Sequence, residues 1–188
     1  MIVNKTKYLE FKVTDKPLNR EWLYVKRTND TNQHDSAVVI TTIVKKNNKY
    51  NFLFLKTQRP PIFAENKAQY CLESPAGLIG DENTKESLID CIKKELLEET
   101  GYVADNIFIE LTNSSTSAGL TSETITYATA IINNDKIISD PISDNGVISD
   151  RVFVPVNNII NYINSIDKKS ISISSALICG LFFAVNRI

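Results

Sequence analysis

Three glutamates that share one face of an expected helix are the residues of this sequence best suited to chemistry. Glu95, Glu98 and Glu99 stand at positions i, i+3 and i+4, so a helix brings their carboxylates onto one face. Like charges at this spacing repel each other, and a cation bound by all of them reverses that cost. Carboxylate oxygens suit hard ions such as Mg²⁺ or Mn²⁺, which neutralise phosphoryl charge and activate bound water. A solvated acidic helix face is the alternative interpretation.

A helix over residues 83–100 is predicted to position these carboxylates. Apolar residues recur there at helical spacing, at Leu88, Ile92, Leu96 and Leu97. Asn83 is expected to cap the first turn, with Glu86 three residues later in a capping-box arrangement. Gly101 follows the last turn, where a glycine commonly ends a helix.

Strand and helix patterns alternate along the rest of the chain. Strands are expected at residues 8–13, 22–26, 37–44, 50–55, 107–111, 123–132 and 147–154. Helices are expected at residues 156–166 and 172–186, and Pro60–Pro61 is expected to break the chain. Because strands surround and outlast the helices, the sequence predicts an α+β fold with a mixed sheet flanked by helices.

Length, charge and cysteine usage exclude several classes of protein. A chain of 188 residues suits one domain with a small appendage, and a net charge of −1 gives no basic footprint for nucleic acid. The three cysteines are an odd number without a CxxC pair, which indicates reduced thiols. Residues 176–185 are the most apolar stretch, too short to cross a bilayer and suited to a buried helix. We therefore expect a cytoplasmic protein with neither membrane nor nucleic acid as partner.

The segment that holds the glutamates resembles the Nudix box, G-x5-E-x7-R-E-U-x-E-E-x-G-U, where U is bulky and apolar. The matching residues are Gly80, Glu86, Glu95, Leu96, Glu98, Glu99, Gly101 and Tyr102. Lys94 replaces the arginine of the pattern, and we expect weakened geometry there because lysine lacks a planar fork. The resemblance implies a Nudix α/β/α sandwich with a mixed sheet.

Further segments resemble the ADP-sugar (ADP-ribose) pyrophosphatase branch of that family. They are residues 22–27 (WLYVKR), 58–61 (QRPP), 71–79 (CLESPAGLI) and 117–124 (SAGLTSET), the last with Ala118 in place of a proline. The resemblance implies Mg²⁺-dependent hydrolysis of ADP-ribose to AMP and ribose 5-phosphate. It also implies that residues 1–35 are an N-terminal antiparallel strand extension that forms a homodimer, and that residues 36–188 are the Nudix domain.

The same resemblance assigns roles to the metal-binding residues. Glu95 and Glu99 are expected to be the central metal ligands, with Glu98 a third ligand or the catalytic base. The backbone carbonyl of Ala76 is the expected non-carboxylate ligand. Glu86 is an outer ligand or the partner of Lys94.

Substrate contacts are expected outside the helix. Arg59 and, more weakly, Arg27 are candidates for a phosphate contact, with a surface arginine as the alternative for Arg59. Glu73 is expected to hold a metal or a ribose hydroxyl, unless it is an outward-facing strand residue. Trp22, the single tryptophan, is expected to stack on adenine, unless it packs in the core or a dimer interface.

The catalytic base is the least defined residue of the expected site. The branch often uses a glutamate in the loop before the last strand. In residues 133–150, however, the only acidic residues are aspartates, Asp135, Asp140, Asp144 and Asp150. Asp140 is our prediction for the catalytic base, with Glu123 and Glu98 as alternatives.

Other points stay open from the sequence. Either Gly77 of the PAGL segment or Gly80 makes the tight turn of the box. Other substrates of the fold would be GDP-mannose, NADH or an oxidised nucleoside diphosphate. A nucleotide-sugar sensor without turnover is the rival function outside the hydrolases.

Overall fold

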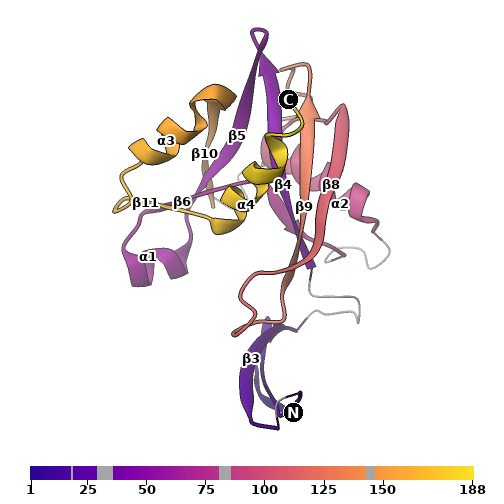
Figure 1. Cartoon of the computed structure of the whole chain (residues 1–188), viewed down its shortest axis with the longest axis vertical. Coiled ribbons are helices and arrows are strands. Elements are labelled where there is room, and N and C mark those ends of the chain that lie inside the picture. Colours follow the sequence, from indigo (N-terminus) through magenta and orange to yellow (C-terminus); the bar gives the residue numbers. More distant parts are fainter. Residues whose placement is uncertain (18, 29–35, 81–85, 143–146) are drawn as a thin grey trace.

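Two separate β-sheets contain all the strands among the described residues, which are 1–17, 19–28, 36–80, 86–142 and 147–188 of a computed structural model (Figure 1). The smaller sheet is antiparallel and consists of β1 (Ile2–Lys5), β2 (Leu9–Thr14) and β3 (Trp22–Arg27). It lies at one end of the molecule, below the larger sheet in Figure 1. The predicted N-terminal pair of strands is thus a sheet of three, because β1 was missed.

The larger sheet is mixed, as predicted. Its strands are β4 (Ser36–Lys46), β5 (Lys49–Thr57), β6 (Tyr70–Glu73), β7 (Ala76–Leu78), β8 (Asn106–Ser115), β9 (Thr124–Ile132), β10 (Ile148–Pro155) and β11 (Ile171–Ile173). They run in the order β11-β6-β5-β4-β9-β8, while β10 also pairs with β5 and β7 with β4. The β4–β9 and β11–β6 pairs are parallel and the others antiparallel.

Helices α2 (Leu88–Thr100) and α4 (Ser175–Ala184) cover opposite faces of β4. Alternation along β4 explains this arrangement, because successive side chains of a strand point to opposite faces. Val38 and Ile40 are fully buried with Leu96 of α2. Ile43 is fully buried on the other side with Leu177 of α4. These layers confirm the predicted α/β/α sandwich.

The predicted start of the long helix is wrong. Helix α2 begins at Leu88, and Ser87 caps it by accepting a hydrogen bond from the backbone N–H of Asp90 at 3.1 Å. Ser87 Oγ also donates to the side chain of Asp90 at 2.6 Å, so both residues of this cap are paired. Asn83 lies outside the described residues. Glu86 precedes the cap and so cannot act as predicted in a capping box.

The C-terminal half of the helix prediction is confirmed. Gly101 adopts a left-handed conformation with φ of 78°, and its N–H donates to Leu97 O at 2.8 Å. Only glycine takes this conformation without strain. The position of Gly101 therefore sets where α2 ends, directly after the glutamates.

Three other elements differ from the prediction. Pro60–Pro61 begins helix α1 (Pro60–Asn66) instead of breaking the chain, because the first helical positions need no N–H donor. The predicted helix at 156–166 is a 3-10 turn (Val156–Asn158) followed by α3 (Ile159–Ser165). The predicted helix at 172–186 starts later, since its first residues extend β11 beside β6.

The most apolar stretch of the chain forms helix α4, as predicted, but the helix is buried on one face only, with Ile178 and Phe182 exposed. Leu177, Gly180, Leu181 and Ala184 of α4 are buried against the larger sheet. Among the described residues, every helix is too short or too polar to cross a bilayer.

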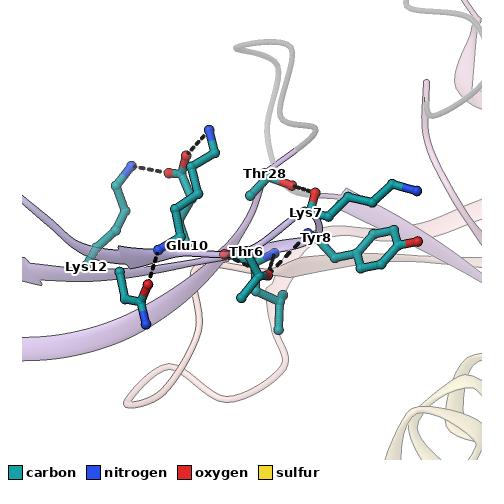
Figure 2. Close-up of polar contacts among 9 residues, drawn as sticks. Thr6, Lys7, Tyr8, Glu10, Lys12 and Thr28 are labelled. Carbon is teal, nitrogen blue, oxygen red and sulfur yellow. Dashed lines mark hydrogen bonds and ion pairs between the residues drawn. The ribbon is translucent and has the colours of Figure 1, made fainter.

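A carboxylate with two lysine partners marks one face of the smaller sheet (Figure 2). Glu10 on β2 is only 9% exposed and lies 3.0 Å from Lys5 Nζ and 3.3 Å from Lys12 Nζ. The hydrogen bond from Lys5 holds the pKa of Glu10 below its ordinary value. Thr28 Oγ1 donates to Lys7 O at 2.5 Å, which joins the end of β3 to the β1–β2 turn. This face of the sheet is therefore polar and internally paired.

Candidate active site

The end of α2 that carries the glutamates packs against the backbone of β7. Glu99 Oε2 accepts a hydrogen bond from the backbone N–H of Ala76 at 2.9 Å. Ala76 is held in turn by β4, where it pairs with Val39. The structure thus brings Glu99 to Ala76, two residues predicted to share a metal ion.

Gly77 allows Glu95 to reach the same stretch of backbone. A Cβ atom built on Gly77 would lie 2.1 Å from Glu95 Cδ, far inside van der Waals contact. Gly80 has a different function, because its φ of 79° requires the left-handed conformation of a tight turn. Both open candidates are therefore needed: Gly80 makes the turn and Gly77 provides the close approach.

Lys94 bridges two acidic residues of the motif. Its Nζ lies 3.7 Å from Glu86 Oε1 and 3.3 Å from Glu95 Oε1. Glu86 also accepts a hydrogen bond from Gly80 N at 3.3 Å, so it closes the turn before the helix. Charge-assisted hydrogen bonds are normally 2.7–2.9 Å long. The longer distances agree with the expectation that lysine holds this site less firmly than arginine would.

Glu95, Glu98 and Glu99 offer oxygen donors only, a set that fits Mg²⁺ or Mn²⁺ rather than a softer metal. All three are half-buried. Within the described ranges, no group of three His, Cys, Asp or Glu side chains is already arranged to hold an ion. A bound cation would therefore have to draw the glutamates closer together.

Arg59 and Glu73, both predicted to contact substrate, form an ion pair. Arg59 Nε donates to Glu73 Oε2 at 2.8 Å, and Thr57 Oγ1 donates to the same oxygen at 2.7 Å. The pair lines a cavity of about 390 Å³ with Cys71. Burial, reinforced by Glu73, raises the pKa of the Cys71 thiol to about 12. Because the thiolate is the reactive form, burial makes Cys71 a poor nucleophile.

Trp22 lines a cavity instead of packing in the core. Its ring is 40% exposed, and Nε1 donates to Gly119 O at 2.9 Å. The cavity holds about 550 Å³ between β3 and the 118–122 loop, and Lys16 and Arg20 make it basic. The guanidinium of Arg20 lies 5.1 Å from the centre of the indole. An aromatic, anionic ligand matches this lining.

Arg27 is paired with a residue that was itself a candidate base. Its Nε and Nη2 lie 2.9 and 2.8 Å from Glu123 Oε2. Glu123 follows the loop that lines the Trp22 cavity. The two side chains therefore fasten β3 to the larger sheet beside that cavity.

Asp140 lies in an exposed segment that passes over the C-terminal end of α2. Ile138 N donates to Gly101 O at 2.8 Å, and Ile142 N donates to Glu98 O at 2.6 Å. Asp140 is thus carried close to the last turn of α2, and its role as base stays a prediction. Asp144 lies outside the described residues.

Two side chains that support the site were not predicted from the sequence. Thr57 fixes Glu73, as described above, and Arg151 on β10 donates from Nε to Glu99 O at 2.5 Å. A contact to a main-chain oxygen leaves no spacing pattern, so Arg151 could be found only in the structure. Thr57 is one of many threonines on strands and carries no signal either.

Gly77→Ala tests whether the close approach of Glu95 is essential. The added methyl group would force Glu95 or β7 to move. We therefore expect the affinity for Mn²⁺ to fall by at least about ten-fold. The free energy of unfolding should fall by about 1–3 kcal/mol. Isothermal titration and thermal unfolding measure the two effects. Gly119→Ala is the matched control, because its Cβ would meet Trp22 at an ordinary 3.8 Å. Equal Mn²⁺ affinity in both variants would contradict the assignment.

Comparison with curated proteins gives three named relatives, while no protein-family model matches the chain. An uncharacterized Nudix hydrolase of Schizosaccharomyces pombe is 34% identical over 62% of this chain and 53% of that protein. A putative nudix hydrolase of Caenorhabditis elegans is 28% identical, over 79% and 66%. The ADP-sugar pyrophosphatase of Mus musculus is 27% identical, over 78% and 65%. The chain thus spans between about half and two-thirds of the length of these relatives.

Two solved structures share the fold at 18% sequence identity. An ADP compounds hydrolase superimposes with a TM-score of 0.64, covering 100% of this chain and 89% of that one. The NUDIX domain of Shewanella oneidensis NrtR, complexed with ADP ribose, gives 0.55 over 82% and 88%. The chain therefore has the fold of these two proteins, and its relatives in sequence are named as Nudix hydrolases or as an ADP-sugar pyrophosphatase.

Proposed function

We propose that this protein hydrolyses the diphosphate bond of ADP-ribose or a related ADP-sugar, giving AMP and a sugar phosphate. The observation that carries the proposal is the convergence of Glu95 and Glu99 on the Ala76–Gly77 backbone. Named similarities support the substrate class, since they include an ADP-sugar pyrophosphatase, an ADP compounds hydrolase and a domain complexed with ADP ribose.

Mg²⁺, or Mn²⁺ in its place, is the proposed cofactor, since Nudix hydrolases generally need a divalent metal. Glu95, Glu98, Glu99 and the Ala76 carbonyl would hold it. The N–H bond from Ala76 to Glu99 is compatible with this, because a carboxylate offers about four lone-pair sites. When bound, the ion would neutralise phosphate charge and lower the pKa of a bound water.

Protein side chains would bind the phosphates and direct the water. Water attacks one phosphorus of the diphosphate, the bridging P–O bond breaks, and AMP leaves. Asp140 or Glu98 would accept the proton of the attacking water. Arg59 would offset charge that develops on the phosphoryl oxygens, with its direction set by Glu73. Arg27, fixed by Glu123, is the weaker phosphate candidate.

The Trp22 cavity is the proposed site for adenine. The hydrogen bond to Gly119 holds the indole in one orientation, which reduces the entropy lost when a base stacks on it. Lys16 and Arg20 would attract the phosphates of the same ligand. GDP-mannose, NADH or an oxidised nucleoside diphosphate are the alternative substrates, because the lining of this cavity carries no contact specific to adenine.

A sensor that binds a nucleotide-sugar without turnover is the second candidate function. The long contacts of Lys94 and the absence of glutamate from residues 133–150 favour it. The complete set Glu95, Glu98 and Glu99 favours the hydrolase, because a sensor has no need to retain charges that repel each other.

Turnover of ADP-ribose with Mg²⁺ tests the proposal. We expect wild-type protein to release AMP, and Glu99→Gln to lower kcat by about a hundred-fold or more because a metal ligand is lost. Chromatography of the nucleotides measures both. Glu65→Gln, an exposed glutamate on α1, should leave kcat unchanged. Wild-type protein that binds ADP-ribose without cleaving it, and that cleaves no other nucleoside diphosphate sugar, would instead establish the sensor function.

We also propose that the smaller sheet forms a homodimer. One face of β2 and β3 is apolar, formed by Leu9, Phe11, Val13, Leu23 and Val25. Leu9, Phe11 and Leu23 are 36, 42 and 65% exposed, and none of these five residues belongs to a hydrophobic core cluster of the described chain. A small sheet with an uncovered apolar face gains stability when a second copy covers it. The opposite, polar face carries Glu10 and its lysines.

Leu23→Asp tests this interface. A buried, unpaired carboxylate would weaken association, so we expect the mass in solution to fall from about twice the 21.1 kDa of one chain toward a single chain. Light scattering after size exclusion measures the mass. Ile160→Asp on α3, where the side chain is 67% exposed, should leave the dimer intact. A wild-type protein that is monomeric at all concentrations would contradict the proposal.

A cytoplasmic location is proposed on the state of the cysteines. Cys71 and Cys179 are free cysteines. Free thiols are typical of proteins that work in a reducing compartment.

A further inference from the structure

Arg151 on β10 reaches across to the metal-ligand end of α2. Its Nε donates to Glu99 O at 2.5 Å, and its Nη2 donates to Ile142 O at 2.9 Å. Pairing of Arg151 with Leu55 on the antiparallel β5–β10 ladder fixes the origin of the side chain. One guanidinium therefore joins the last turn of α2 to the segment that carries Asp140.

The end of a helix leaves main-chain carbonyls without partners inside the helix. Here, Glu98 O accepts from Ile142 N, and Gly101 O accepts from Ile138 N. Arg151 supplies the donor for Glu99 O between them. A Cβ on Gly101 would lie 2.4 Å from Ser139 O, so the 137–142 segment is pressed onto the helix end. Among these three contacts to the carbonyls at the end of α2, Arg151 supplies the one that comes from a side chain.

The charge of Arg151 suits its position. A cation is favourable at the C-terminal end of a helix, where the dipole is negative. An arginine remains charged in proteins, so it stabilises the negative end of α2 throughout the working pH range.

We propose that Arg151 is a positioning residue for the hydrolytic site, holding Glu99 and the Asp140 segment in the one arrangement that binds metal and directs water. The inference rests on the proposed function for its catalytic part, but its geometric part concerns only α2 and residues 137–142. Lysine cannot replace the arginine, because a single ammonium lacks the planar fork that reaches two carbonyl groups at once.

Mn²⁺ binding to the full chain tests the geometric part without any turnover. Electron paramagnetic resonance of free Mn²⁺ would measure the dissociation constant for wild type, Arg151→Lys and Arg151→Gln. Loss of a residue that orients a ligand is expected to weaken binding by about ten-fold or more in both variants. Arg187→Gln is the matched control, since Arg187 makes a comparable double contact, to Glu110 on β8, and neither residue belongs to α2 or to residues 137–142. It should leave Mn²⁺ affinity unchanged.

Amide exchange and kinetics separate positioning from general stability. At a temperature where all variants are folded, exchange at Ile138 and Ile142 should accelerate in the Arg151 variants only. With saturating metal, kcat for ADP-ribose should fall while KM changes by less than about two-fold. Arg151 variants that bind Mn²⁺ like wild type and keep these amides protected would overturn the inference. A wild type that binds Mn²⁺ but cleaves no ADP-ribose would count against the proposed activity alone.

Discussion

The close approach of Glu95 on α2 to Gly77 on β7 is the constraint on which the site depends. Three carboxylates on one helix face repel each other, and burial of the adjoining apolar stripe of α2 holds them there. Ile92 and Leu96 of α2 are fully buried in the core, which fixes the position of the helix relative to the sheet. With the register set, Glu95 passes Gly77 at a distance that leaves no room for a methyl group.

Strand β4 transmits this constraint to the rest of the molecule. It pairs with β5, β7 and β9, and it contacts α2 on one face and α4 on the other. The same strand therefore holds the backbone that faces the glutamates and the core behind it. The smaller sheet does not pair with β4. It contacts the rest of the molecule through the Arg27–Glu123 ion pair and through Val25, whose N–H donates to Leu120 O at 2.8 Å. The Trp22 cavity depends on that attachment.

Much of this arrangement could be predicted from the sequence, because it follows from local patterns. Gly101 ends the helix by its backbone freedom, and the apolar run at residues 37–44 predicts a buried strand, which is found as β4. The start of α2 could not be fixed, since Ser87 and Asn83 are both good caps and only the fold decides between them. Sequence spacing likewise pointed to Gly80 or Gly77 without showing that both are needed for different reasons. Arg151 was missed because it acts on main-chain oxygens supplied by distant segments.

The measurement that bears most directly on the site is the position of a bound metal. Crystals grown with Mn²⁺ and a non-hydrolysable ADP-ribose analogue would give anomalous peaks at the ions. We predict a peak about 2.0–2.4 Å from carboxylate oxygens of Glu95 and Glu99 and from the Ala76 carbonyl, with the analogue's diphosphate beside it. Mn²⁺ bound elsewhere, with Glu95 still beside Lys94 and Glu99 still accepting from Ala76 N–H, would contradict the central role of these glutamates.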